Sequence, residues 1–278
     1  MTALPIPNIR LNDGNLIPQL GFGVFLVDPA ETERIVSEAL EVGYRHIDTA
    51  SIYKNEAAVG RAIAASGIPR EELFITTKLW NSDHEDPHGA FDASLERLGL
   101  DSVDMYLVHW PVPMYGTALG AWRGLVEIVG SGRADSIGVS NFEIEHLQEL
   151  LRETGVVPAV NQIELHPLHQ RRELREFCRE QGIAIESWGP LAQGKSDLFE
   201  REAISEPARI HRRTPAQIVL RWHLQQGTIV FPKTTSRERM VENASLFDFV
   251  LSDPEMEAIA ELDEQRNFGT NPREMSVR

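Results

Sequence analysis

The sequence predicts an α/β fold, namely a (β/α)8 TIM barrel, and three observations lead to this expectation. Eight short apolar runs alternate with segments in which apolar residues recur at helical spacing. Polar and aromatic residues gather at the C-terminal ends of most of these runs. No linker or low-complexity stretch divides the 278 residues, a length that suits one barrel. We therefore expect residues 1–278 to form a single domain, a closed parallel sheet covered by helices.

The eight expected strands are short and mostly apolar. They span residues 20–25, 44–49, 73–80, 103–110, 135–141, 159–165, 183–188 and 228–232. Ahead of them, Asp13–Gly14 separates two alternating apolar runs, which predicts a β-hairpin with a type I′ turn. We expect this N-terminal hairpin to cap the bottom of the barrel, and the short C-terminal tail, residues 264–278, to lie near its top.

The expected helices begin and end with residues typical of helix caps. Asp28, Thr214 and Ser252 each precede a proline in the first turn. This fits an N-cap followed by proline, because a backbone N–H has no partner in the first turn of a helix and proline lacks one. Apolar residues within 31–42 and within 143–152 mark one helical face. Glycines stand where several helices are expected to end, namely Gly43, Gly67, Gly155, Gly182 and Gly227.

Composition narrows the classes of function. A net charge of −15 argues against nucleic acid or an anionic membrane as the main partner, because both repel an acidic surface. The first residues lack the features of a signal peptide, and no apolar run approaches the ~18 residues of a membrane span. We therefore expect a cytoplasmic protein. The one cysteine, Cys178, excludes an intramolecular disulfide and is expected to be a packing residue.

Polar and aromatic side chains mark the ends of seven of the expected strands. Any one of them can simply mark the change from strand to loop, but the set together favours an active site, which barrels build at this end. The set includes Asp48, Lys78, His109, Ser140, Asn141, Gln162, Glu164, Trp188, Lys233 and Thr234. His84 and His88 lie apart, among carboxylates on a polar loop. We expect a solvated loop there, and no metal site.

Four residues near these ends have the chemistry that reduction of a carbonyl group requires. Such a reaction needs an acid that protonates the developing alkoxide and a group that orients the carbonyl. Tyr53 can be the acid if a neighbouring cation lowers its pKa, and Lys78, paired with Asp48, can be that cation. His109 can donate a hydrogen bond to the carbonyl oxygen. Each of these residues also has a purely structural interpretation: an ordinary ion pair for Asp48 and Lys78, a packed loop residue for Tyr53 and a core histidine for His109. Spacing alone therefore indicates a barrel enzyme with these four residues as candidate catalytic groups.

At these residues the chain resembles the aldo-keto reductase superfamily, and most closely the bacterial 2,5-diketo-gluconate reductases. The resemblance runs through nearly the whole chain, in the stretches GYRHIDTASIYKNE (43–56), FITTKLW (74–80), YLVHWP (106–111), SIGVSNF (136–142), VNQIELHP (160–167), IESWGPLAQGK (185–195) and FPKTTSRERMVEN (231–243). It implies a catalytic tetrad of Asp48, Tyr53, Lys78 and His109, with Tyr53 as proton donor.

The resemblance also implies NADPH as cofactor. Ser140, Asn141 and Gln162 match residues that bind the nicotinamide carboxamide, and Trp188 matches the aromatic residue that stacks on the nicotinamide ring. The remaining implied contacts are Gly189, Leu191, Gln193 and Gly194 at the pyrophosphate, Lys233, Thr234, Thr235, Ser236 and Arg239 at the 2′-phosphate, and Glu242 and Asn243 at the adenine. The basic side chains before a helix N-terminus support an anion site independently. No Rossmann fingerprint is present, and the family does not use one.

These observations imply NADPH-dependent reduction of small aldehydes or ketones, diketo acids and α-dicarbonyls included. Phe25, Trp80, His109 and Trp110 are expected to line the substrate pocket. Two alternatives stay open: a non-catalytic NADPH-binding sensor, and a lyase in which Lys78 forms a Schiff base. The partner is expected to be a small carbonyl compound, and the resemblance implies a monomer.

Overall fold

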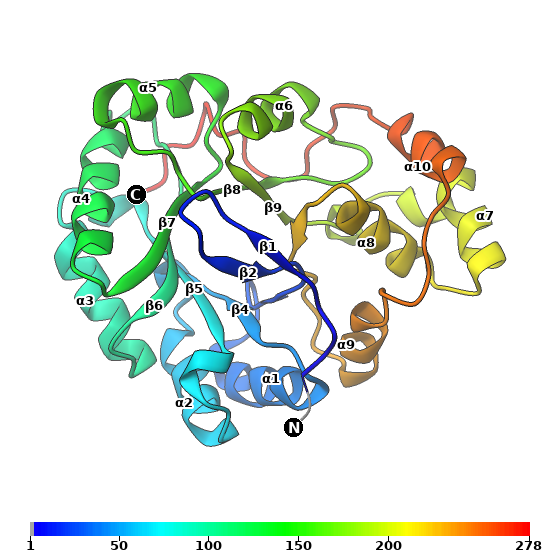
Figure 1. Cartoon of the computed structure of the whole chain (residues 1–278), viewed down its shortest axis with the longest axis horizontal. Helices are drawn as coiled ribbons and strands as arrows, with labels where there is room; N and C mark the ends of the chain where they lie inside the picture. The colour runs from blue at the N-terminus through cyan, green and yellow to red at the C-terminus, as the bar shows by residue number, and fades with distance from the viewer. Residues whose placement is uncertain (1–2) are drawn as a thin grey trace.

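The computed structural model describes residues 3–278 as a closed barrel of parallel strands (Figure 1). The strands are β3 (Phe22–Gly23), β4 (His46–Asp48), β5 (Phe74–Leu79), β6 (Val103–Val108), β7 (Ala134–Ser140), β8 (Val160–Glu164), β9 (Ala184–Trp188) and β10 (Ile229–Val230). They pair in sequence order from β3 to β10. A parallel bridge between Leu20 and Val230 joins the two edges, so the predicted fold class is confirmed.

Two glycines allow this closure. A Cβ atom at Gly21 would lie 2.7 Å from the ring of Phe231, and one at Gly23 would lie 3.3 Å from Phe231 Cβ. The chain therefore passes Phe231 more closely than larger residues would permit. The expected first strand, residues 20–25, is regular only over Phe22–Gly23.

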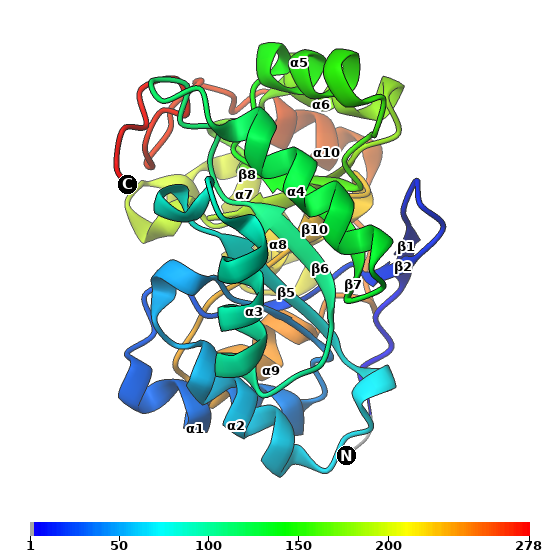
Figure 2. The same ribbon diagram turned by 90° about the vertical axis from the view of Figure 1, so that its left-hand side faces the viewer.

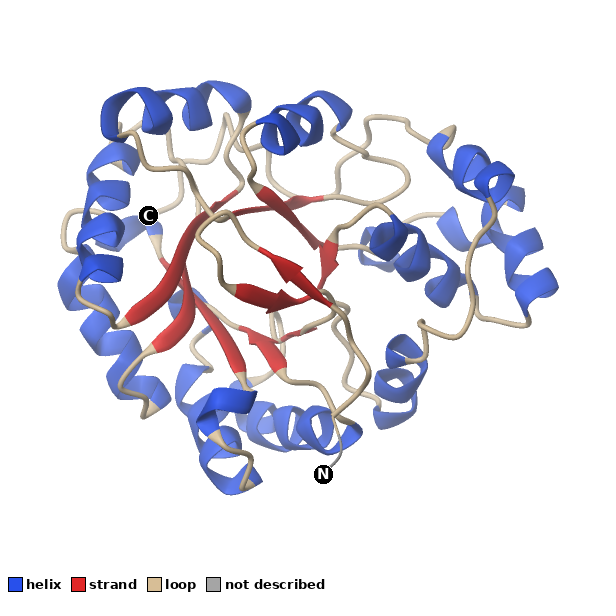
Figure 3. Ribbon diagram, viewed as in Figure 1, coloured by secondary structure: helices blue, strands red, loops and turns tan. Residues whose placement is uncertain are grey.

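Helices follow the strands and form the outer layer of the barrel (Figure 3). They are α1 (Pro29–Val42), α2 (Glu56–Ser66), α3 (Pro87–Leu98), α4 (Ala118–Gly130), α5 (Ile144–Thr154), α6 (Arg172–Glu180) and α9 (Arg237–Ala244), with α7 (Glu202–His211) and α8 (Pro215–Gln225) between β9 and β10, and α10 (Asp253–Ala260) near the end. Within residues 3–278, none of these helices is long and apolar enough to cross a membrane.

Helix α1 has the predicted N-cap at Asp28 and the predicted glycine, Gly43, at its C-terminal end. The Asp28 carboxylate accepts a hydrogen bond from the Ala30 N–H at 2.9 Å, and Pro29 occupies the first turn. The helix buries Ile35, Val36, Ala39 and Leu40 against the barrel. Gly43 then takes a φ of 116°, a left-handed conformation that costs glycine little.

The N-terminal hairpin, β1 (Asn8–Arg10) and β2 (Leu16–Pro18), covers the bottom of the barrel, as predicted. The Asn15 side chain donates to Asp135 O and Ser136 Oγ, both 2.9 Å away, at the start of β7. Figure 2 shows the hairpin and the C-terminus at opposite ends of the molecule. The tail accordingly lies near the top.

The predicted type I′ turn is wrong. Gly14 has a φ of 95°, but Asp13 is not among the residues with positive φ. The Leu11 N–H donates to Asn15 O at 2.9 Å, which closes a three-residue loop, and the Gly14 N–H donates to Leu11 O. This is the pattern of a type I turn followed by a glycine with positive φ. The Asp13 carboxylate accepts from the Asn15 N–H at 3.0 Å and favours this longer loop.

Candidate active site

Three neighbouring strands and the loop after the first of them bring the four candidate catalytic side chains together at the top of the barrel. Asp48 ends β4, Lys78 lies near the end of β5, and His109 follows β6 directly. Tyr53 ends a short 3-10 helix, η1 (Ser51–Tyr53). The carboxyl ends of parallel strands meet at one edge, so the register of the sheet places these residues side by side.

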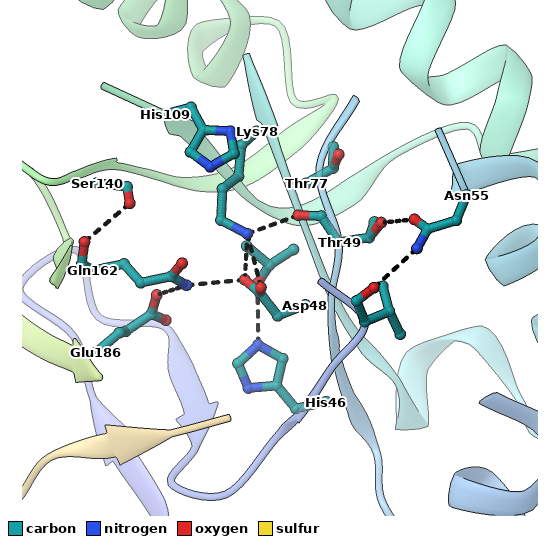
Figure 4. A network of polar contacts seen from close by, with 12 residues as sticks. His46, Asp48, Thr49, Asn55, Thr77, Lys78, His109, Ser140, Gln162 and Glu186 are labelled. Carbon is teal, nitrogen blue, oxygen red and sulfur yellow. Dashed lines mark hydrogen bonds and ion pairs between the residues drawn. The ribbon is translucent and has the colours of Figure 1, made fainter. Parts of the chain in front are cut away.

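Hydrogen bonds to the barrel hold the loop that carries Tyr53. The Thr49 hydroxyl donates to Asn55 Oδ1 at 2.8 Å, and the Asn55 amide donates to Val24 O at 3.0 Å (Figure 4). The Ser51 hydroxyl donates to Lys78 O at 3.1 Å. These bonds tie both ends of the loop to β3, β4 and β5, which fixes the position of the phenol.

Lys78 and Asp48 form a buried ion pair. The ammonium donates to Asp48 Oδ1 at 2.7 Å, to Asp48 Oδ2 at 2.8 Å and to Thr49 O at 2.8 Å. Burial alone would lower the pKa of Lys78, but the adjacent Asp48 carboxylate outweighs it and the pKa is raised. All three N–H groups are engaged and the amine stays protonated. It therefore lacks the free lone pair that a Schiff-base lysine needs, and the structure disfavours the lyase alternative.

Tyr53 stands over Lys78, whose Nζ atom lies 5.2 Å from the centre of the phenol ring. The predicted lowering of its pKa is wrong for this structure. Burial raises the pKa of Tyr53 to about 12, because desolvation outweighs the lowering by Lys78, and Asp48 raises it further. The phenol consequently carries its proton throughout the neutral pH range. That is the state a proton donor requires, since an alkoxide is a much stronger base than a phenolate.

His109 lies in an aromatic surrounding made by Tyr53, Trp80 and Trp110, with ring centres 5.7, 5.2 and 6.4 Å away. Burial, reinforced by Lys78, lowers the pKa of His109 well below its ordinary value, so the ring is neutral. Nδ1 is buried and has no partner among the described residues. A proton on Nε2 avoids an unsatisfied buried donor at Nδ1 and leaves His109 able to donate from Nε2.

The residues expected at the nicotinamide form one hydrogen-bonded group with the tetrad. The Asn141 amide donates to His109 O at 3.0 Å, and the Ser140 hydroxyl donates to Gln162 O at 2.9 Å. The Trp188 indole N–H donates to Asn141 Oδ1 at 2.8 Å, which fixes the plane of the indole ring. Trp188 is only half-buried, so the ring remains available for stacking.

The expected pyrophosphate loop and phosphate clamp lie at the same end. Gly189, Ala192, Gln193 and Gly194 all have φ between 53° and 66°, so the loop after β9 is tightly coiled. Ser236 caps α9, and Thr234 Oγ1 accepts from the Ser236 N–H at 3.1 Å. Around this cap Lys233, Thr235 and Arg239 are exposed, Glu242 is half-buried and Asn243 is buried. Leu191, in the loop after β9, is half-buried.

Among the described residues, Lys233 and Arg239 make no ion pair, whereas Arg237 pairs with Glu41 at 2.7 Å. Two unpaired cations at one helix N-terminus, Lys233 before α9 and Arg239 in its first turn, are suited to an anion. The carboxylate of Glu242 accepts from Thr214 Oγ1 at 2.7 Å, so α8 holds that side chain in place.

Aromatic rings lie around Tyr53 at the top of the barrel. Phe25 is half exposed, and its ring centre lies 5.0 Å from that of Tyr53. Trp110 packs with Val112 and Met275 in a small apolar cluster that Trp80 and Trp188 also touch. Sequence reasoning named Phe25, Trp80 and Trp110 but not Met275, because nothing in the tail sequence indicates which of its residues folds inward.

The tail is fastened across the top of β8. The Glu164 carboxylate accepts from the backbone N–H of Phe268 at 2.7 Å and of Gly269 at 3.0 Å. A Cβ atom at Gly269 would lie 2.3 Å from Cη2 of Trp188 and 3.0 Å from Glu164 Oε2. Glycine is therefore needed where the tail crosses the indole ring.

Gly269→Ala is accordingly expected to displace the tail from Trp188. Overpacking of this kind costs about 1–3 kcal/mol, and the tail can relieve it by moving away together with Met275. We expect KM for the carbonyl substrate to rise while the protein stays folded. Steady-state kinetics on this variant and on Gly120→Ala, where a Cβ would meet nothing within 4 Å, provide the comparison. Equal KM values in the two variants would show that the tail does not shape the pocket.

The prediction of a solvated loop is wrong for His84. This residue is buried, and its Nδ1 lies 2.9 Å from Thr117 Oγ1. Burial lowers the pKa of His84 to about 4. His88 does lie at the surface, 3.0 Å from Glu127 Oε2. Cys178 is buried in α6, and desolvation raises the pKa of its thiol to about 12, as befits a packing residue.

The fold and this group of residues define a barrel enzyme with a buried lysine–carboxylate pair beneath a tyrosine. Comparison with known proteins agrees. The model of the aldo/keto reductase family matches residues 19–264. A methylglyoxal reductase DkgA from Yersinia pestis is 53% identical over 98% of both chains, and an aldo-keto reductase from Mycolicibacterium smegmatis is 51% identical over 96% of this chain and 97% of the other.

Solved structures agree as well. An aldo/keto reductase from Brucella melitensis is 50% identical, covers 93% of this chain and all of its own, and superimposes with a TM-score of 0.89. A variant of Gox0644 in complex with NADPH is 44% identical over 98% of this chain and 99% of the other, with a TM-score of 0.93. The chain belongs to the aldo/keto reductase family. It is an NADP-dependent oxidoreductase that reduces carbonyl groups.

Proposed function

We propose that the chain reduces small α-dicarbonyl compounds, methylglyoxal among them, with Tyr53 as proton donor. The observation that carries the proposal is the placement of a protonated phenol between a charged lysine and a neutral histidine, beside the aromatic ring of Phe25. Relatives that are 49–53% identical are named methylglyoxal reductases.

The chain's own residues supply everything except the hydride. NADPH, when bound, would supply the hydride for the carbonyl carbon, which leaves the electron pair of the C=O bond on oxygen. His109 orients that oxygen by a hydrogen bond, and Tyr53 transfers its phenolic proton to it. The phenolate that remains is stabilised by the Lys78 ammonium and regains a proton from solvent. Asp48 keeps the ammonium charged and in place.

The described residues fit NADPH. Trp188 offers an indole face that Asn141 holds in a fixed plane, and Ser140 and Gln162 lie next to it on β7 and β8. The coiled loop that contains Gly189, Leu191, Gln193 and Gly194 would cover the pyrophosphate. Around the start of α9, Lys233, Thr234, Thr235, Ser236 and Arg239 would hold the 2′-phosphate, with Glu242 and Asn243 at the adenine.

Arg239→Ala is expected to weaken NADPH binding by about tenfold or more, because charge-assisted hydrogen bonds to a phosphate are lost. NADH lacks that phosphate, so its Kd should stay nearly constant. Titration of both coenzymes against the wild type, Arg239→Ala and the exposed control Arg209→Ala measures the difference. Equal weakening of both coenzymes would place Arg239 away from the 2′-phosphate.

The substrate class is tested by comparing kcat/KM for methylglyoxal, a 2,5-diketo acid and a simple alkyl aldehyde. We expect methylglyoxal to be preferred, because Phe25, Trp80 and Trp110 offer a compact aromatic surface rather than a cationic one. A preference for the diketo acid would assign the chain to sugar-acid reduction instead.

We further propose that residues 1–278 act as one domain, as a monomer in the cytoplasm.

A further inference from the structure

A second buried carboxyl group lies beneath the tetrad. Glu186 is in the middle of β9, and none of its surface is exposed. The Gln162 amide nitrogen donates to Glu186 Oε2 at 2.9 Å and to Asp48 Oδ2 at 2.9 Å (Figure 4). One amide group therefore bridges two carboxyl groups. The other oxygen of Glu186, Oε1, is buried and has no partner within residues 3–278.

The charges around Glu186 do not balance if it is ionised. On β4 it faces the Asp48 carboxylate. His46, two residues before Asp48, supplies no charge there, because burial lowers the pKa of its imidazole to about 3. On β5 it faces the Lys78 ammonium. Its sheet neighbours, Gln162 on β8 and Ile229 on β10, carry no charge. Lys78 is already paired with Asp48, so a second buried carboxylate would lack a cation of its own.

Buried charges without a partner are expensive, and a carboxyl group usually takes up a proton instead. Burial, with the Asp48 carboxylate, raises the pKa of Glu186 to about 8. The neutral acid can still accept from Gln162 through Oε2. With its proton on Oε1, Glu186 presents Oε2 as an acceptor, and Asp48 Oδ2 also accepts, so the Gln162 nitrogen faces both oxygens and its carbonyl oxygen faces away.

We propose that Glu186 is a positioning residue that is protonated in the active enzyme. It fixes the orientation of the Gln162 amide and leaves Asp48 and Lys78 as an isolated, neutral pair. This inference rests on the proposed function of Tyr53 and Lys78. Reduction then depends also on the proton of a group that touches neither coenzyme nor substrate.

Ionisation of Glu186 should slow reduction. A second negative charge near Lys78 weakens the net positive potential at Tyr53, so the phenolate that forms on proton transfer is less stable. The donor is then a weaker acid. With the proton of Glu186 lost around pH 8, kcat should fall about tenfold between pH 7 and pH 9, since the protonated fraction falls from about nine tenths to about one tenth over that range. Tyr53, with a pKa of about 12, does not ionise in this range.

The kinetic test compares the ratio of kcat at pH 9 to kcat at pH 7 in three proteins. We expect a ratio near one tenth in the wild type and in Glu180→Gln, an exposed control, and a ratio near one in Glu186→Gln. The glutamine has the shape of the protonated acid but cannot ionise. The same alkaline decline in Glu186→Gln as in the wild type would overturn the proposal.

A second measurement does not depend on activity. The infrared difference spectrum between wild type and Glu186→Gln at pH 7 should contain the C=O stretch of a protonated carboxylic acid, and that band should disappear above pH 9. A difference spectrum that shows only carboxylate bands at pH 7 would overturn the proposal even if the enzyme reduces carbonyls. Conversely, a protonated band in a protein without turnover would leave Glu186 as inferred and remove the proposed function.

Discussion

Replacement of Tyr53 by phenylalanine is expected to lower kcat for carbonyl reduction by about 10²–10⁴-fold, the usual contribution of a positioned proton donor. The ring keeps its contacts with Phe25 and His109, so only the hydroxyl group is lost. The alkoxide must then take its proton from water. We expect the Kd for NADPH to stay nearly constant, which stopped-flow kinetics and coenzyme titration can measure together.

The matched control for this variant is Tyr106→Phe. The Tyr106 hydroxyl on β6 is buried and has no hydrogen-bond partner among residues 3–278, so its removal should leave both stability and activity close to wild type. Full activity in Tyr53→Phe would require another acid. Loss of NADPH binding in Tyr53→Phe would show that the phenol contributes to the coenzyme site.

The second large effect is expected from the ion pair beneath Tyr53. Lys78→Met leaves the Asp48 carboxylate buried without its cation, and breaking one side of a buried pair costs about 3–5 kcal/mol. The same variant removes the charge that stabilises the phenolate of Tyr53. We therefore expect a clear loss of unfolding free energy in urea together with loss of reduction.

A double variant separates the two consequences. In Lys78→Met with Asp48→Asn, no carboxylate is left unpaired, so much of the unfolding free energy should return while reduction stays absent. Far-ultraviolet circular dichroism across a urea series measures the unfolding free energy, and coenzyme oxidation measures the reduction activity. If activity returned with stability, Lys78 would have only a structural role.

The fold could be predicted from the sequence because its repeating unit is local. The eight apolar runs and the caps at Asp28 and Gly43 are each determined by neighbours within a few residues. The candidate catalytic residues Asp48, Lys78 and His109 could be expected to lie together for the same reason, since each stands where a strand ends. The turn at Asp13–Gly14 was mispredicted because the Asp13 side chain stabilises a loop one residue longer than the pattern indicated.

What could not be predicted depends on contacts distant in the sequence. The burial of His84 requires Thr117, 33 positions away. The raised pKa of Tyr53 follows from desolvation of the phenol by side chains distant in the sequence, which no short pattern records. Glu186 did leave a signal, a carboxyl group within the apolar run 183–188, but only the amide bridge of Gln162 shows that it faces Asp48.

Consumption of NADPH by the purified chain in the presence of methylglyoxal, with Tyr53→Phe measured in parallel, tests the central claim most directly. The site predicts saturable turnover with one product alcohol formed for each NADPH oxidised, and its loss in the variant while NADPH still binds. Saturable NADPH binding without turnover of methylglyoxal or any other carbonyl compound, or undiminished turnover in Tyr53→Phe, would contradict the assignment of Tyr53, Lys78 and His109 as the groups that reduce the carbonyl.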